Sequence, residues 1–534
     1  MKKSCEKQVQ HHVAKPKRLV HDIRFHLAIT AAACLTIGIA QSVQAFDAVV
    51  PVSSLNGSNG FRMNSVERRG RFGKAVSNAG DINGDGIDDL IVGAPDIDSA
   101  FVLFGSAAGF NAAISTSSLN GANGFRLNDG GGATGRSVSD AGDINGDGID
   151  DLIVGAYYAA HGGSYSGSSY VLFGSTSTFS ATLGLSTLNG TNGFRLDGVG
   201  ERDYSGKSVS GAGDINGDGI DDIIIGAPEA DPNGIATSGS SYVLFGSTAG
   251  FASAFSLSTL DGTNGFRIDG SSVNDFSGRS VSDAGDINGD GIDDLIIGGY
   301  GANSFTGAGY VLFGSASGFA ATLALSSLNG ANGFRLDGIT EYDSTGQSVS
   351  SAGDINGDGI NDLVIGAPKS DTTSTGYAYN AGVSYVVFGS TAGFNATLSL
   401  SALNGTNGFA LEGEQQDWAG SSVSGIGDIN DDGVDDLLIG AEGGNAGYVV
   451  FGSTAGFNAT QKLSSLNGNN GFRIDTSEGD QGLGSSVSSA GDINGDGFND
   501  LIIGNRQYGS FSEGAAYVVF GQGKSDVIYA NGFE

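Results

Sequence analysis

The sequence predicts an all-β protein, a seven-bladed β-propeller of four-stranded antiparallel blades whose N-terminal strand closes the last blade. Three observations lead to this fold. An acidic nine-residue loop, first seen as Asp81–Asp89, occurs seven times at spacings of 62 to 74 residues. Each copy carries four short apolar segments bounded by Gly, Asn and Ser. Four short strands repeated around a ring are typical of propellers.

The second copy shows the four expected strands of a blade. They are Gly135–Ser139, before the loop, Leu152–Gly155, directly after it, Tyr170–Gly174, and the segment Leu188–Arg195. All are rich in β-branched and aromatic residues, and Asn-Gly pairs supply the positive φ of tight turns. A linear β-solenoid is the alternative architecture, but its repeats are usually much shorter.

The order of the segments predicts how the ring closes. A lone fourth segment, Leu55–Arg62, precedes the first complete unit, and the seventh unit ends after its third segment, Tyr517–Gly521. We therefore expect Leu55–Arg62 to complete the last blade, because a closed ring leaves no open sheet edge. The domain boundaries follow as residues 46–523 for the propeller and 524–534 for a short tail.

Residues 1–45 have the pattern of a secretory signal peptide. A basic lead is followed by the apolar run Leu27–Ala40 and by Val43-Gln44-Ala45, a small-residue cleavage pattern. A membrane anchor is the alternative, but a span needs about 20 apolar residues. We expect an exported protein, located outside the cell, at its surface or in the periplasm, with no membrane span in the mature chain.

Removal of that segment would leave an acidic chain without cysteine. Cys5 and Cys34 both lie in it, and the formal net charge of −33 would become −38. Such a charge disfavours nucleic acid and anionic lipid as partners. It also means that no disulfide could stabilise the exported domain.

The acidic loop has the composition of a calcium site. In Asp81–Asp89, side-chain oxygens occur at positions 1, 3, 5 and 9, glycine at position 6 permits a reversal, and the position-7 carbonyl could turn inward. Calcium prefers six to eight oxygen ligands, whereas Mg²⁺ is less suited and zinc lacks Cys and His partners. An EF-hand is excluded because position 12 is apolar in all seven copies. A charged turn without metal is the alternative.

Comparison of the seven copies assigns the ligands. Positions 1, 5 and 9 are always Asp and position 3 is always Asn, whereas position 8 varies and is therefore expected to face solvent. The sequence predicts up to seven Ca²⁺, one per blade. The candidate ligands are Asp81, Asn83, Asp85, Ile87 and Asp89; Asp143, Asn145, Asp147, Ile149 and Asp151; Asp214, Asn216, Asp218, Ile220 and Asp222; Asp286, Asn288, Asp290, Ile292 and Asp294; Asp354, Asn356, Asp358, Ile360 and Asp362; Asp428, Asn430, Asp432, Val434 and Asp436; and Asp492, Asn494, Asp496, Phe498 and Asp500.

These motifs resemble the FG-GAP repeat of integrin α-subunit propellers. Phe72-Gly73 stands ahead of the loop and Gly93-Ala94-Pro95 behind it, and the loop is similar to that family's calcium motif. The resemblance covers about residues 52–521 and implies calcium loops between the first and second strands of the blades. It also implies adhesion or recognition of an extracellular protein or glycan. The chain departs from the integrin pattern, since Gly-Ala-Pro is intact only in copies one, three and five and all seven copies have the loop. It therefore looks more like a bacterial-type secreted FG-GAP protein than like an integrin subunit. We expect it to be monomeric.

Other features give weaker indications. The Phe-Arg pairs of the fourth segments are expected to pack between blades and to pair with a carboxylate or carbonyl. The single tryptophan, Trp418, is expected to pack rather than to bind a ligand, and the inserts Glu229–Ser240 and Lys369–Val383 are expected to be surface loops. No nucleophile elbow accompanies the lone His161, so we expect no enzyme. A hydrolase or lyase, and a purely structural surface or matrix component, are the alternatives.

Overall fold

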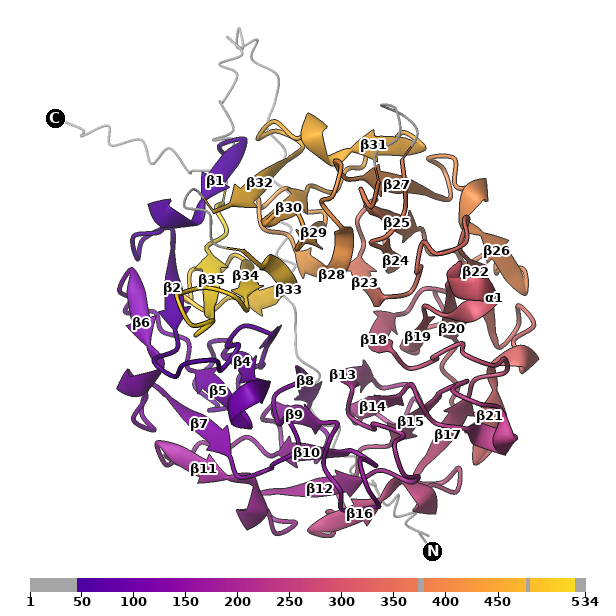
Figure 1. Ribbon diagram of the computed structural model, residues 1–534, viewed down its shortest axis with the longest axis horizontal. Coiled ribbons are helices and arrows are strands. Elements are labelled where there is room, and N and C mark those ends of the chain that lie inside the picture. The colour runs from indigo at the N-terminus through magenta and orange to yellow at the C-terminus, as the bar shows by residue number, and fades with distance from the viewer. Residues whose placement is uncertain (1–45, 373–378, 477–480, 524–534) are drawn as a thin grey trace, which may run out of the picture. The chain divides into compact units, whose positions relative to one another are not determined.

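In the computed structural model, seven five-stranded sheets are arranged like the blades of a propeller (Figure 1). Residues of the inner strand of every blade line a hollow at the centre, which we call the central channel. The structure describes residues 46–372, 379–476 and 481–523. The predicted signal peptide, residues 1–45, and the predicted tail, residues 524–534, lie outside the described residues. The predicted all-β propeller with seven blades is confirmed.

Each blade has four antiparallel strands and a short fifth one. From the channel outward, blades 1 to 4 consist of β3 (Ala75–Asn78), β4 (Leu90–Ala94), β5 (Ser99–Leu103), β7 (Gly124–Asn128) and β11 (Thr182–Gly184); β8 (Ser137–Gly142), β9 (Asp151–Ala156), β10 (Ser168–Leu172), β12 (Gly193–Asp197) and β16 (Ala254–Ser256); β13 (Ser208–Gly213), β14 (Asp222–Ala227), β15 (Ser240–Leu244), β17 (Gly265–Asp269) and β21 (Thr322–Ala324); and β18 (Ser280–Gly285), β19 (Asp294–Gly299), β20 (Ala308–Leu312), β22 (Gly333–Asp337) and β26 (Thr397–Ser399).

Blades 5 to 7 follow the same order. They consist of β23 (Ser348–Gly353), β24 (Asp362–Ala367), β25 (Val383–Val387), β27 (Gly408–Glu412) and β31 (Thr460–Lys462); β28 (Ala419–Gly427), β29 (Asp436–Ala441), β30 (Ala446–Val450), β32 (Gly471–Asp475) and β1 (Val49–Pro51); and β33 (Leu483–Gly491), β34 (Asp500–Asn505), β35 (Ala515–Val519), β2 (Gly60–Asn64) and β6 (Ala113–Ser115).

Helical turns are short and lie in the connections. All seven fifth strands run directly into a single 3-10 turn, whereas η2, η5 and α1 connect second and third strands. The turns are η1 (Val52–Ser54), η2 (Pro95–Ile97), η3 (Thr116–Ser118), η4 (Leu185–Thr187), η5 (Pro232–Gly234), η6 (Leu257–Thr259), α1 (Ala302–Phe305), η7 (Leu325–Ser327), η8 (Leu400–Ala402) and η9 (Leu463–Ser465). In the part of the chain that the structure describes, no helix has the length and hydropathy of a transmembrane segment.

The fifth strand was not predicted, and it comes from the next unit of the chain. In blade 1, β11 pairs in parallel with β7, with Thr182 opposite Arg126 and Gly184 opposite Asn128. The prediction of four-stranded blades is therefore corrected to five strands. Each parallel pairing ties a blade to its neighbour and covers the outer edge of the fourth strand, which would otherwise present unpaired backbone groups.

The N-terminal segment closes the ring in two places. Strand β2 is the fourth strand of blade 7 and pairs antiparallel with β35, with Phe61 opposite Val518. The predicted closure is thereby confirmed. In addition, β1 forms the fifth strand of blade 6, with Val49 opposite Arg473 in β32. The first described residues thus join the last two blades (Figure 1).

The hydrophobic core lies between neighbouring blades. Phe125 of β7 is fully buried and stacks on Phe179, which precedes β11, with ring centroids 4.6 Å apart and planes inclined by 12°. The same stacking recurs between Phe194 and Phe251, at 4.3 Å. The adjacent Arg126 donates to Glu67 Oε1 at 2.6 Å. The predicted roles of the Phe-Arg pairs, packing and charge pairing, are confirmed in these blades.

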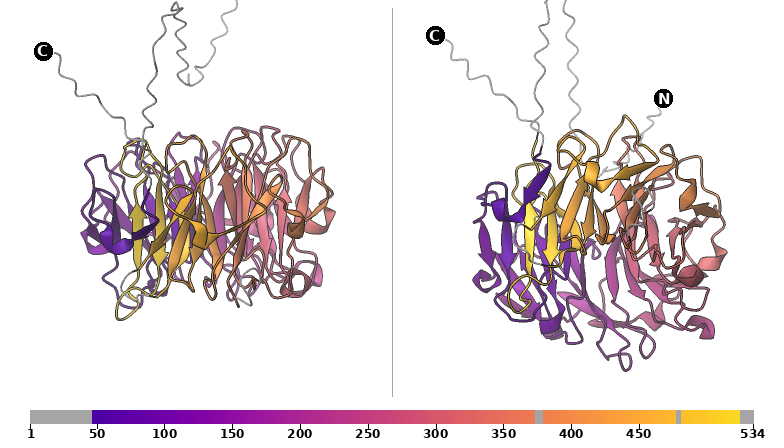
Figure 2. Two further views of the ribbon diagram at one scale, coloured as in Figure 1. Left: turned by 90° about the horizontal axis from the view of Figure 1, so that it is seen from above. Right: turned by 45° about the horizontal axis from the view of Figure 1, so that its top comes forward.

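The two faces of the ring carry opposite chemistry. In blade 2 the inner strand β8 is followed at one end by the acidic loop that opens at Asp143, and it is preceded at the other end by Arg136. Because a strand rises about 3.3 Å per residue, these two residues lie on opposite faces, roughly 20 Å apart. We call the face with the seven loops the acidic-loop face. Figure 2 shows the blades from the side, with connecting loops at both faces.

Candidate metal sites

The acidic loops are folded by their own side chains. In the first loop, the amides of Asp85 and Gly86 donate to Asp81 Oδ1 and Oδ2 at 2.9 and 2.7 Å. The amide of Ile87 donates to Asp85 Oδ1 at 3.0 Å. The position-1 carboxylate makes the same two bonds in the other six loops. Seven loops of one conformation therefore gather the predicted position-1 and position-5 carboxylates in the same way.

Position 9 is a buried carboxylate at the base of each loop. Asp89 is fully buried, and its Oδ1 accepts the amide of Gly105, after the third strand, at 2.8 Å. Asn83 Nδ2 donates to both oxygens of Asp89 at 3.2 and 3.1 Å. The six counterparts are also fully buried: Asp151, Asp222, Asp294, Asp362, Asp436 and Asp500. As predicted, the carboxylate stands where the loop meets the buried second strand.

Among the described residues, no basic side chain lies within 4.0 Å of any of these seven carboxylates. Burial, together with repulsion from the neighbouring Asp85 and Asp81 carboxylates, raises the pKa of Asp89 from 3.8 to about 8. The same causes raise the pKa of each of the other six to about 8. A carboxylate surrounded by others in a dry site favours either a proton or a cation.

The residues of the loops fit a hard cation, although the side chains need one rearrangement. Among the described residues, no three His, Cys, Asp or Glu side chains converge as a ready metal cluster. In the first loop, Asn83 directs its amide nitrogen at Asp89, and rotation of that amide would present oxygen instead. In the seventh loop, Asp500 Oδ2 is buried without a hydrogen-bond partner. An oxygen-only set with an unsatisfied buried carboxylate suits Ca²⁺.

Position 8 does not face solvent, which corrects the prediction from the sequence. Asp88 is half-buried, and its Oδ2 accepts the backbone amide of Asp492, the first residue of the loop in blade 7, at 2.7 Å. Four further pairs join successive loops at 2.8 to 2.9 Å, from the amides of Asp81, Asp143, Asp214 and Asp354 to the carboxylates of Asp150, Asp221, Asp293 and Asp435. The sequence missed this because the partner lies in another repeat.

Asparagine takes this position in two loops. Asn361 lies against Gly285, directly before the loop of blade 4, and Asn499 lies against Gly427, directly before the loop of blade 6. Both glycines have positive φ, as does Gly80 at the equivalent place before the first loop. Every loop thus has the position-8 side chain of the next blade packed against its start.

Replacing Asp88 by Ala should therefore weaken the junction between blades 7 and 1. We expect the free energy of unfolding to fall by about 1–3 kcal/mol, because the amide of Asp492 loses its partner in a half-buried place. Asp88→Asn should lower the free energy of unfolding by less, because Asn occurs at this position in two of the loops. It also places no charge in a site where burial raises the pKa of Asp88. Urea unfolding measures both, and equal costs for Ala and Asn would contradict this role.

Two residues that the sequence singled out have defined places. Trp418 is 45% exposed and lies at the mouth of the central channel, on the face opposite the acidic loops, so its side chain packs at the surface and only in part. His161 Nδ1 lies 3.3 Å from Ser168 Oγ, which is buried and donates to Asp197 at 3.2 Å. A serine that is buried and directs its proton at a carboxylate is not arranged as a nucleophile.

Comparison with known families agrees with this geometry. The FG-GAP repeat model matches residues 72–100, 135–172, 205–244, 278–312, 345–387 and 483–519. The chain carries FG-GAP repeats. The six FG-GAP matches fall in blades 1 to 5 and in blade 7. Blade 6, which is not among them, has Asp431 in place of a loop glycine and Gly440-Ala441-Glu442 at the end of its second strand.

Integrin α-subunits are the relatives found by sequence. Integrin alpha pat-2 of Caenorhabditis elegans is 30% identical over 227 residues, which cover 41% of this chain and 17% of that protein. Integrin alpha-5 of Xenopus laevis is 28% identical over 286 residues, which cover 50% of this chain and 24% of that protein. The chain thus spans a quarter or less of the length of these subunits. The FG-GAP propeller is integrin α-like, as the resemblance implied.

Proposed function

We propose that this chain is an exported, calcium-stabilised propeller that recognises an extracellular protein or glycan. The observation that carries the proposal is the sevenfold loop, which places one buried, unneutralised carboxylate in every blade. The FG-GAP repeats and the likeness to integrin α-subunits support recognition or adhesion. The apolar run at Leu27–Ala40, after a basic lead, supports export.

Calcium would act as a structural ion. In the first loop, Asp81, Asp85 and Asp89 would supply carboxylate oxygens, Asn83 an amide oxygen and Ile87 a carbonyl oxygen. A cation would offset the repulsion among carboxylates that otherwise raises the pKa of Asp89. Both cysteines of the chain, Cys5 and Cys34, lie in the predicted signal peptide, so the exported domain would have no disulfide. Bound calcium would then provide the stabilisation that disulfides provide in other exported domains.

The raised pKa values predict a pH dependence that calcium should remove. Without calcium, the position-9 carboxyls have pKa values of about 8 when folded, against 3.8 ordinarily, so the folded state binds more protons between these values. Stability is then greatest at low pH and is lost as the pH rises through about 8. In chelator, we expect a higher melting temperature at pH 5 than at pH 8. Saturating calcium should abolish or reverse that difference, and the same pH profile with and without calcium would contradict it.

Recognition is tested directly by an array of glycans and extracellular matrix proteins, probed with residues 46–534 in calcium and in chelator. The proposal expects a ligand that binds in calcium and is lost or weakened in chelator. Binding to no component would favour a purely structural role. Turnover of an arrayed polysaccharide would favour the hydrolase or lyase alternative, which the arrangement of His161, Ser168 and Asp197 does not support.

A further inference from the structure

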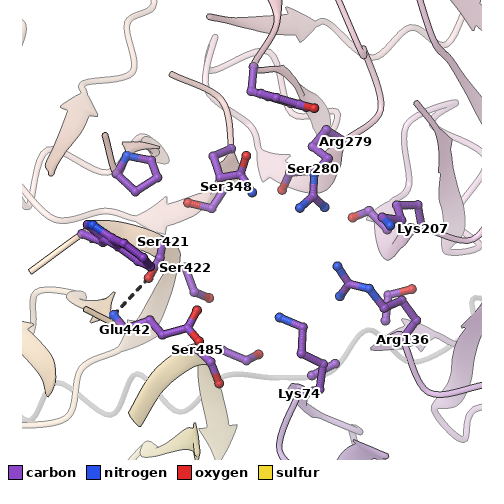
Figure 3. Close-up of a pocket in the computed structure, with 18 of the residues that line it drawn as sticks. Lys74, Arg136, Lys207, Arg279, Ser280, Ser348, Ser421, Ser422, Glu442 and Ser485 are labelled. Carbon is purple, nitrogen blue, oxygen red and sulfur yellow. Dashed lines mark hydrogen bonds between the residues drawn. The ribbon is translucent and has the colours of Figure 1, made fainter. Parts of the chain in front are cut away.

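The central channel opens, on the face opposite the acidic loops, into a cavity of about 630 Å³. Four basic side chains from four successive blades point into it: Lys74, Arg136, Lys207 and Arg279 (Figure 3). Each stands at the same place, at the start of the inner strand of its blade. In blades 5, 6 and 7 the equivalent residues are Gln347, Ser421 and Ser485. The cations thus form an arc around one side of the cavity.

The four cations lack anionic partners. Within the described residues, none of them has a carboxylate within 4.0 Å. The cavity's acid, Glu442, accepts Arg506 Nε at 2.6 Å. Lys207 Nζ lies 4.0 Å from the centre of the Tyr157 ring, which neutralises no charge. Four unpaired cations in one cavity are notable in a chain whose formal net charge is −33.

The surroundings show that these charges oppose one another. Burial, followed by repulsion from Arg136 and Arg279, lowers the pKa of Lys207 to about 7. Burial and repulsion from Arg279 lower the pKa of Arg136 to about 10. Lys74 has its pKa lowered by burial and by Arg136. Such a group of half-buried like charges is costly unless an anion joins it.

The remaining wall offers hydroxyl groups and one indole. Eight of the residues that line the cavity are serines, among them Ser348, Ser421 and Ser485 (Figure 3). Trp418 lies at the rim, is 45% exposed, and donates its backbone amide to Asn380 O at 3.1 Å. Hydroxyl donors and acceptors match a polyhydroxylated ligand, and an exposed indole can cover an apolar sugar face.

We propose that this cavity binds the anionic end of an acidic oligosaccharide, with carboxylate or sulfate groups on the four cations and sugar hydroxyls on the serine wall. The inference rests on the proposed recognition function and specifies its ligand. A short or terminal segment fits better than a long polyanion, because the chain as a whole carries a formal net charge of −33. At physiological salt, charges farther away than about 8 Å are largely screened, so the local cations dominate inside the cavity.

Binding of a heparin-derived tetrasaccharide, measured by calorimetry in calcium, tests the proposal. We expect the wild-type chain to bind it and the double variant Arg136→Gln/Arg279→Gln to bind at least tenfold more weakly, since charged hydrogen bonds are lost. Gln347 occupies the same backbone position in blade 5, so glutamine is compatible with the fold. As the matched control, Lys462→Gln removes one positive charge from β31, at the outer edge of blade 5, and should leave affinity unchanged.

A variant that adds charge tests the same site in the opposite direction, because it should strengthen binding and not weaken it. Gln347→Lys extends the arc to a fifth blade and should strengthen binding of the tetrasaccharide. Neutral maltotriose should not bind, and a hexaglutamate peptide should bind more weakly than the tetrasaccharide. Tighter binding of hexaglutamate would overturn the assignment in favour of an acidic peptide. If neither cavity variant alters the affinity for the tetrasaccharide, the cavity is not its binding site. The same holds if a ligand found on the array binds both variants as tightly as the wild-type chain. Either result would overturn the assignment of the cavity and would leave the proposed recognition function in place.

Discussion

Chelation of calcium should lower the melting temperature of residues 46–534 by about 10 °C. A site that holds calcium at ten times its dissociation constant adds about 1.4 kcal/mol to the free energy of unfolding, so seven sites add roughly 10 kcal/mol. For a propeller of this length, the entropy of unfolding near the midpoint is about 1 kcal/mol per kelvin. The expected shift follows from these two quantities. An unchanged melting temperature in calcium and in chelator would show that the loops hold no structural calcium.

The sixth loop provides a matched pair of variants for the ligand assignment. Asp432 is at position 5, a predicted ligand, whereas its neighbour Asp431 is at position 4, where the other six loops have glycine. Asp432→Ala should remove most of that loop's calcium-dependent stability. Asp431→Gly should preserve it, and should relieve a non-glycine residue with φ of 55°. Calcium titration of both variants decides the assignment, and equal losses would overturn it.

Removing residues 46–64 should prevent formation of the monomeric ring. That segment contains β1 and β2 and four buried apolar side chains: Phe46, Leu55, Phe61 and Met63. Their burial contributes roughly 6–12 kcal/mol, which is comparable to the net stability of a whole domain. The truncation would also expose the edges of β35 and β32, which invites pairing between copies. We expect aggregates or oligomers of residues 65–534 in light scattering.

The matched control is the chain that begins at residue 46. It retains both closing strands and should remain monomeric with the full melting transition. A synthetic peptide of residues 46–64 added to the truncated chain should restore the monomeric ring by strand addition. A truncated chain that stays monomeric with an unchanged melting temperature would show that closure contributes little.

The features that recur in each repeat could be predicted from the sequence. The loop geometry depends on residues within nine positions, so seven copies of Asp-x-Asn-x-Asp-Gly-x-x-Asp were sufficient to predict seven blades and their loops. The closing role of Leu55–Arg62 followed from an incomplete last unit, and the strand itself, β2, begins at Gly60. These predictions rested on local chemistry and on counting.

Features formed between repeats were missed. The fifth strand is only three residues long, and β11 pairs with β7, a strand of the preceding unit, so no alternation of side chains reveals it. The role of Asp88 depends on a partner in the last blade. The cation arc had one visible signal, which is the variable second residue of the Gly-x-Ser-Val-Ser segment. It is basic in Arg136, Lys207 and Arg279, but only the ring brings these residues to one cavity.

The bonds between acidic loops give the propeller a property that a linear row of repeats lacks. A row of repeats can melt inward from its two ends, since each terminal unit has a single neighbour. Here the amide of Asp492 donates to Asp88, and this contact joins the last loop to the first. Four further hydrogen bonds of this kind, and two asparagine side chains packed against glycines, complete a circuit in which every loop contacts two others. Binding of an ion in one loop should therefore stiffen the loops on both sides, and calcium should fill the ring more steeply than seven independent sites would allow.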